Sequence, residues 1–265
     1  MSHLPAGPET SAPPARLPRR EKAVIIAALA AVTALSWVYV YRQMQPMAGD
    51  MGAMAPAGFA PWSAADFALN AAFWWAMMPG MMLPSAAPMI LTFATVNRRR
   101  RERGRAFVPT AVFTAGYLIA WGLFGIAATG ADWGLERAAL MTPATQALAA
   151  PLAALLLAAA GLYQLTPLKS VCLSHCRSPL DFALHHWRDG SAGALRMGFE
   201  HGLYCLGCCW FLMALLFAAG IMSLVWMAAI TAFVLVEKLF PAGHRIARIG
   251  GVAMLGLALY LLIQR

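Results

Sequence analysis

Residues 197–219 read MGFEHGLYCLGCCWFLMALLFAA, and this stretch is the clearest indication of the fold class. Its one formally charged residue is Glu200, close to the start. A helix needs about 20 consecutive apolar residues to cross the hydrocarbon core of a bilayer. The stretch therefore predicts a transmembrane helix that carries a histidine and three cysteines among apolar side chains.

The rest of the chain has the same character. Of its 265 residues, 61% are hydrophobic and only 12% are charged, where soluble domains carry roughly 25% charged residues. Backbone groups inside a bilayer must be satisfied without water, so spanning segments form helices or closed barrels. The apolar runs are too continuous for the alternating strands of a barrel. We therefore expect an all-α, polytopic transmembrane helical bundle.

The apolar runs predict about seven spans, within a range of six to eight. They lie at residues 23–41, 64–96, 107–129, 145–165, 197–219, 221–236 and 246–263. Residues 1–22 are expected to form a disordered basic tail and residues 42–63 a Met-rich outer loop. Residues 64–265 form the predicted membrane domain, with a Cys/His-rich inner segment at 166–196. Pro79, Gly80, Pro84 and Pro88 interrupt the second run and predict a broken helix there.

The basic residues predict the orientation of the chain. Of the 20 Lys and Arg residues, all but Arg42, Arg137 and Arg265 fall on one side if the N-terminus is cytoplasmic. This is the bias of the positive-inside rule. We expect a multi-pass protein of the bacterial inner (plasma) membrane, with a cytoplasmic N-terminus and a periplasmic C-terminus. The net charge of +9 then indicates contacts with lipid headgroups and not with nucleic acid.

The cysteines are the main candidates for chemistry, because all five lie between positions 172 and 209. This is the inner half of the predicted topology, where structural disulfides are not favoured. Cys205 follows His201 by four residues, and Cys208 and Cys209 follow Cys205 by three and four, so they share one helix face. Thiolates and imidazole suit Cu(I), with zinc as the alternative.

One helix seldom completes a metal site, so further ligands are expected from the inner segment. The candidates are Cys172, His175 and Cys176, with His185 and His186 as less favoured additions. Glu200 and Glu237 lie near the inner ends of their spans. They would orient the ligands or accept the protons that thiols release on binding a metal.

Methionines form a second signal, because thioethers are soft, neutral ligands that select Cu(I) over Zn(II). They cluster in the outer loop (Met44, Met47, Met51 and Met54) and in the second span (Met77, Met78, Met81, Met82 and Met89). Together with the inner thiols they would line a path for the ion. Packing around the prolines explains the second cluster almost as well.

Two other interpretations of the cysteines remain open. Cys205-Leu-Gly-Cys208 has the C-x-x-C spacing of thiol–disulfide exchange, although no cysteine lies on the predicted outer side to exchange electrons with it. Cysteines also pack as small residues between membrane helices, which suits a structural assembly factor. No phosphate loop or nucleophile elbow occurs in the sequence, so neither an ATP-driven pump nor a hydrolase is expected.

Three stretches carry a resemblance to a known family. They are Gly198–Trp210 (GFEHGLYCLGCCW) with Gly220–Ala228 and Val236-Glu-Lys238, the stretch Trp75–Pro84 (WAMMPGMMLP), and Cys172-x-x-x-Cys176. Over roughly residues 65–260 the chain resembles the bacterial predicted metal-binding integral membrane proteins of the DUF2182 type. Some members of that family are labelled copper chaperones. The resemblance implies metal binding, and does not choose between transport, chaperoning and redox roles.

Our hypothesis from the sequence is a membrane protein that binds copper, as Cu(I), for delivery or transport. The lipid bilayer and the metal ion are its expected partners, with a membrane or periplasmic protein as a further candidate. We favour a binding protein over an enzyme. The alternatives are a thiol–disulfide oxidoreductase that uses Cys205 and Cys208, and an assembly factor of a membrane complex.

The predicted orientation is tested by labelling single cysteines in a background whose native cysteines are replaced by serine. An Ala48→Cys variant should react with a membrane-impermeant maleimide in intact cells, because residue 48 is predicted to lie outside. A Glu102→Cys variant should react only after permeabilisation. The reverse pattern would overturn the orientation.

Overall fold

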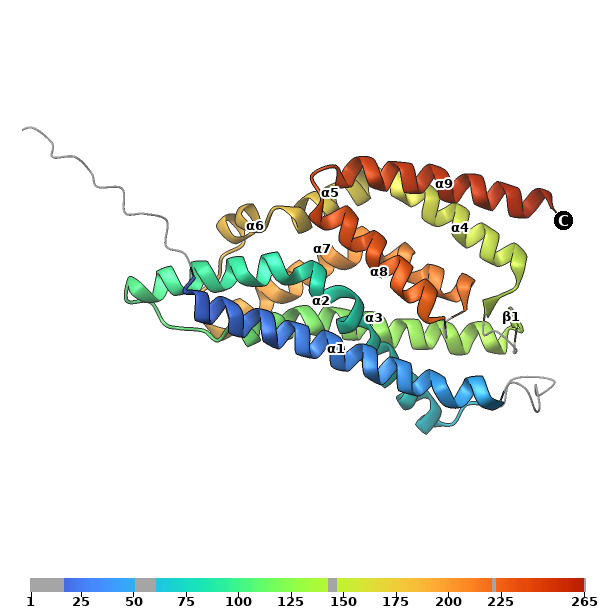
Figure 1. The fold of residues 1–265 in the computed structure, drawn as a ribbon, viewed down its shortest axis with the longest axis horizontal. Coiled ribbons are helices and arrows are strands. Elements are labelled where there is room, and N and C mark those ends of the chain that lie inside the picture. The colour runs from blue at the N-terminus through green and yellow to red at the C-terminus, as the bar shows by residue number, and fades with distance from the viewer. Residues whose placement is uncertain (1–16, 51–60, 143–146, 221–222, 265) are drawn as a thin grey trace, which may run out of the picture.

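The structure, a computed structural model, describes residues 17–50, 61–142, 147–220 and 223–264, and the side chains of residues 45–50 are not described. The chain forms a bundle of helices (Figure 1), which confirms the predicted fold class. The helices are α1 (Arg19–Asp50), α2 (Ala64–Glu102), α3 (Thr110–Arg137), α4 (Ala150–Leu165), α5 (Pro167–Arg177), α6 (Pro179–His185), α7 (Gly190–Ala219), α8 (Leu224–Leu239) and α9 (Gly243–Ile263). Two short antiparallel strands, β1 (Met141–Thr142) and β2 (Ala147–Leu148), lie between α3 and α4.

Five of the described helices, α1, α2, α3, α7 and α9, are long and apolar enough to cross a membrane by length and composition. The pair α4 and α5, bent by 65° at its junction, counts as a sixth span if both helices belong to one crossing. The 16 residues of α8 rise only about 24 Å, less than a hydrocarbon core of ~30 Å. The seven predicted runs thus coincide with helices over most of their length, and five or six meet the criterion for a span.

The elements near the N-terminus extend beyond their predicted bounds. Helix α1 begins at Arg19, inside the predicted tail, and continues to Asp50, inside the predicted outer loop. Met44 of this extension is buried in the core, as is Val40 just before it, so packing against the bundle extends the helix beyond its most apolar run. Met51, Met54 and the side chain of Met47 lie outside the described residues, so the predicted outer methionine cluster cannot be placed.

Helix α2 corrects the prediction of a broken helix, because it continues from Ala64 to Glu102 with three prolines inside it. Figure 1 shows that it bends along its length. Pro84 has no N–H for the carbonyl of Gly80, four residues before it. The indole Nε1–H of Trp37 on α1 donates to this carbonyl at 3.1 Å. A neighbouring helix thus supplies the missing donor.

Helices α3 and α7 pack backbone to backbone at glycines. A Cβ on Gly116 of α3 would overlap the carbonyl of Leu195, and a Cβ on Gly198 of α7 would overlap the carbonyl of Phe113. Small residues allow such close approach in membrane bundles, where packing replaces the hydrophobic effect as the force between helices. This contact brings Tyr117 of α3 next to the cysteines of α7.

Ion pairs gather three predicted inner segments at one end of the bundle. Arg98 near the end of α2 pairs with Glu21 at the start of α1, and Arg100 pairs with Asp189 just before α7 at 2.6 Å. The Trp187 indole N–H and the Arg100 guanidinium lower the pKa of Asp189, which keeps its carboxylate charged for this pair. In Figure 1 the C-terminus lies at the opposite end.

The close approach of α3 and α7 can be tested with matched glycine substitutions. Gly198→Ala should destabilise the protein by about 1–3 kcal/mol, because the new methyl group overlaps a backbone carbonyl. Gly256→Ala in α9 is the control, because its methyl group would meet no heavy atom within 4 Å beyond its two neighbours in the chain and the adjoining backbone of its own helix. Thermal unfolding in detergent measures both. Equal stability of the two variants would contradict the packing described.

Candidate metal site

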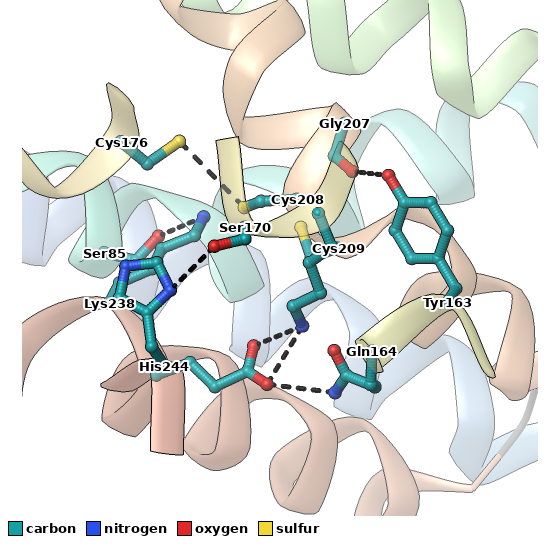
Figure 2. A network of polar contacts seen from close by, with 12 residues as sticks. Ser85, Tyr163, Gln164, Ser170, Cys176, Gly207, Cys208, Cys209, Lys238 and His244 are labelled. Carbon is teal, nitrogen blue, oxygen red and sulfur yellow. Dashed lines mark hydrogen bonds and ion pairs between the residues drawn. The ribbon is translucent and has the colours of Figure 1, made fainter. Parts of the chain in front are cut away.

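Three cysteines of α7 lie in the centre of the bundle, and two of them reach sulfur atoms on other helices. Cys205, Cys208 and Cys209 are each about 1% exposed. The Sγ of Cys208 lies 4.0 Å from the Sγ of Cys176 on α5 (Figure 2), and the Sγ of Cys209 lies 4.0 Å from the Sδ of Met82 on α2. The site therefore contains two close sulfur pairs, here called the thiol pair (Cys176 and Cys208) and the thioether pair (Cys209 and Met82).

The backbone of α7 fixes the direction of these thiols. Cys208 and Cys209 both donate to the carbonyl of Cys205, each at 3.0 Å, the usual local bond of a small polar side chain in a helix. The two neighbours still point to different helices, because successive residues are about 100° apart around the axis. All five cysteines are free thiols.

Helix α5 lies close to α7 because Gly207 leaves room for it. A Cβ on Gly207 would come within 2.8 Å of the Sγ of Cys172. On the same residue, the hydroxyl of Tyr163 on α4 donates to the Gly207 carbonyl, and this bond joins α4 to α7. Cys172 is half-buried beside Gly207 and belongs to neither sulfur pair, whereas Cys176, one turn later, reaches Cys208.

Cys205 has two polar partners at its sulfur. The Nζ of Lys238 on α8 donates to it at 2.9 Å, and the hydroxyl of Tyr117 on α3 lies 3.0 Å away. Lys238 also donates to the Oγ of Ser85 at 3.2 Å (Figure 2). All four side chains are buried. A charge-assisted hydrogen bond of this kind is strong where water is excluded.

A complete ion pair lies beside the sulfurs. The Nζ of Lys169 contacts both carboxylate oxygens of Glu237, at 2.9 and 2.8 Å, and both side chains are 1% exposed. Gln164 donates to the same carboxylate at 2.9 Å. Glu237, a candidate for orienting the ligands, thus points to Lys169. Glu200, the other candidate, pairs with Arg196 at 2.9 Å.

The histidines are placed apart from the sulfur pairs. His201 is buried among the rings of Phe113, Tyr117 and Phe182, and its Nδ1 has no hydrogen-bond partner among the described residues. His175 stacks on Tyr204 with ring centroids 4.4 Å apart. His185 bonds the carbonyl of Asp181, and His186 stacks on Phe182.

The side chains do not form a ready-made cage of the predicted composition. Within the described parts of the chain, no three His, Cys, Asp or Glu side chains lie close enough to hold a metal ion. The residues predicted to share one face of α7 (His201, Cys205, Cys208 and Cys209) do not act as one group, because they contact different helices, among them α2, α3 and α5. The thioether of Met82 joins the site instead, and Met77, Met78, Met81 and Met89 are buried along the same helix.

Residues 71–261 match the PpoB2 family, which is described as copper chaperone. The chain belongs to this copper chaperone family. The match covers most of the chain and agrees with the resemblance to the DUF2182 type, so the function is related to copper. No curated protein and no solved structure matches the chain.

Sequence reasoning about this copper chaperone family member missed Lys238, Tyr117, Ser85 and Lys169. Lys238 and Lys169 had no predicted role at the site, yet they are buried, at 7% and 1% exposed. An ionisable residue inside or next to a span is itself a sign of a functional site. That rule, applied to the adjacent Glu237 and Lys238, would have indicated a buried charged site.

The ion pair makes a prediction about stability. Glu237→Leu should destabilise the protein by about 3–5 kcal/mol, because it leaves the ammonium of Lys169 buried and unpaired. The double variant Lys169→Met/Glu237→Leu should recover most of this loss, since it removes both charges. Unfolding in detergent measures both variants, and a double variant no more stable than the single one would contradict the pairing.

Proposed function

We propose that this protein holds Cu(I) at the buried sulfur pairs and passes it on, for copper delivery or transport across the bilayer. The spacing of the thiol pair is the main support. Metal–sulfur bonds are about 2.3 Å long, so two sulfurs that share an ion lie at most about 4.6 Å apart. The observed 4.0 Å between Cys176 and Cys208 corresponds to an open S–metal–S angle of about 120°.

The ligand types favour Cu(I) over zinc. Structural zinc sites take four nitrogen or sulfur ligands in a closed tetrahedron, and the described residues provide no group of three His, Cys, Asp or Glu. Cu(I) is satisfied by two or three soft ligands, and thioethers select it. Cys205, Cys208 and Cys209, with Cys176 and Met82, offer such a set.

His201 supports the proposal as an additional ligand. Its Nδ1 is buried without a partner in the described structure, and a buried polar atom left in this state costs free energy. A bound ion is one of the partners that satisfies such an atom. His201 lies one helical turn before Cys205 on α7, and its ring packs against Tyr117, whose hydroxyl lies 3.0 Å from the Cys205 sulfur.

The arrangement of the sulfurs suits a transfer by ligand exchange. Cys176 on α5 is only partly buried, whereas Cys209 and Met82 of the thioether pair are fully buried. Met81, Met78 and Met77 continue from Met82 toward the start of α2, along the face buried in the bundle. In this proposal the ion moves between soft ligands one or two at a time, in the bacterial inner membrane, and a membrane or periplasmic protein exchanges it with the chain.

Metal content of the purified protein tests this function. The wild type should hold about one Cu(I) per chain against a competing chelator, and Cys176→Ser/Cys208→Ser should lose at least tenfold in affinity, because the thiol pair is removed. Met82→Leu should weaken Cu(I) binding less, since a thioether is a neutral ligand.

Cys172→Ser and His175→Ala are the matched controls, because both residues lie on α5 outside the sulfur pairs. Both should bind Cu(I) as the wild type does. If Cys176→Ser/Cys208→Ser retained full affinity, or if the wild type bound no copper, the proposed site would be wrong.

A further inference from the structure

The described side chains around the sulfurs carry an unbalanced positive charge. Lys169 and Glu237 form a closed pair that cancels. Lys238 has no carboxylate partner there, since its ammonium contacts only the Ser85 hydroxyl and the Cys205 sulfur. The other buried carboxylate, Asp132, lies four helical turns beyond Tyr117 on α3 and bonds Asn70. The site therefore holds one ammonium in excess of its carboxylates.

We propose that Lys238 is the residue that selects a monovalent over a divalent metal ion at this site. The inference rests on the proposed function and adds a charge rule to it. Metal-bound thiols are deprotonated, so a monovalent ion held by two thiolates carries one net negative charge. The ammonium of Lys238 cancels this charge. A divalent ion on the same thiolates is neutral by itself, and Lys238 would leave one positive charge uncompensated.

The position of Lys238 makes this charge effective. The ammonium touches Cys205, which lies one turn before Cys208 and Cys209 on the same helix, so it acts at close range on any ion that these sulfurs hold. Water does not screen it, because Lys238, Ser85 and Cys205 are all buried. Uncompensated charge is costly in such surroundings, so a neutral complex is favoured over a charged one.

Lys238 also has a structural setting that does not require a metal. It lies in the last turn of α8, where the carbonyl end of the helix favours a cation. If anchoring α8 were its whole role, its loss would weaken the binding of every metal ion alike. Selection by charge instead predicts opposite changes for monovalent and divalent ions, and this difference makes the two roles separable.

The experiment compares the affinities of the purified full-length protein for Cu(I) and Zn(II), each measured by competition with a chelator. Lys238→Met should weaken Cu(I) binding and strengthen Zn(II) binding, so that the ratio of the two affinities falls about tenfold or more. Lys238→Arg keeps the charge and should keep a ratio close to that of the wild type.

A second pair of variants leaves Lys238 in place, in case Lys238→Met does not fold. Ser85→Asp sets a carboxylate beside the ammonium and should lower the ratio as Lys238→Met does. Ser85→Asn has nearly the same shape without the charge and should keep the ratio of the wild type.

A wild type that binds Cu(I), with the same ratio in Ser85→Asp as in Ser85→Asn, overturns the selection by Lys238 and leaves the proposed function standing. A wild type that binds no Cu(I) removes the proposed function and this inference with it. A ratio that falls in Ser85→Asp and holds in Ser85→Asn supports the charge rule.

Discussion

Charge buried away from water must be balanced, and the centre of this bundle is arranged around that constraint. Lys169 and Glu237 balance each other across α5 and α8, while Lys238 reaches the sulfur of Cys205 on α7. These contacts tie α8, which is too short to meet the span criterion, to α5 and α7. The same contacts contribute to the electrostatic surroundings of the sulfurs, because charges act strongly on one another where water is excluded.

The same exclusion of water suits the sulfur side chains of the site. Thiols and thioethers pack as apolar groups when no metal is bound. Cys208, Cys209 and Met82 can therefore lie in the core without a charged partner. In the function that we propose, such ligands suit Cu(I), since it exchanges readily between them and hard oxygen ligands do not compete. Two features let the helices pack closely enough for this. The Gly80 carbonyl, which Pro84 leaves without a donor, accepts from Trp37 on α1, and Gly198 of α7 lies directly against the backbone of α3.

The sequence was enough to predict the helical bundle, because long apolar runs can cross a bilayer in few other ways. It also indicated the region of the proposed site, since Cys205, Cys208 and Cys209 stand together in one apolar helix, and Cys176 was among the expected ligands from the inner segment. The family match over residues 71–261 includes that region.

Which of these side chains meet was decided only by the tertiary structure. Helical spacing gives the direction of a side chain around its own axis, but the neighbour it meets depends on how α2, α3, α5 and α8 pack against α7. That packing directs Cys208 and Cys209 to different helices and surrounds His201 with aromatic rings. It also brings Met82, Tyr117 and Lys238, which lie far apart in the sequence, to the sulfurs of α7. Contacts between residues so far apart depend on close packing of whole helices, and no local pattern of residues records them.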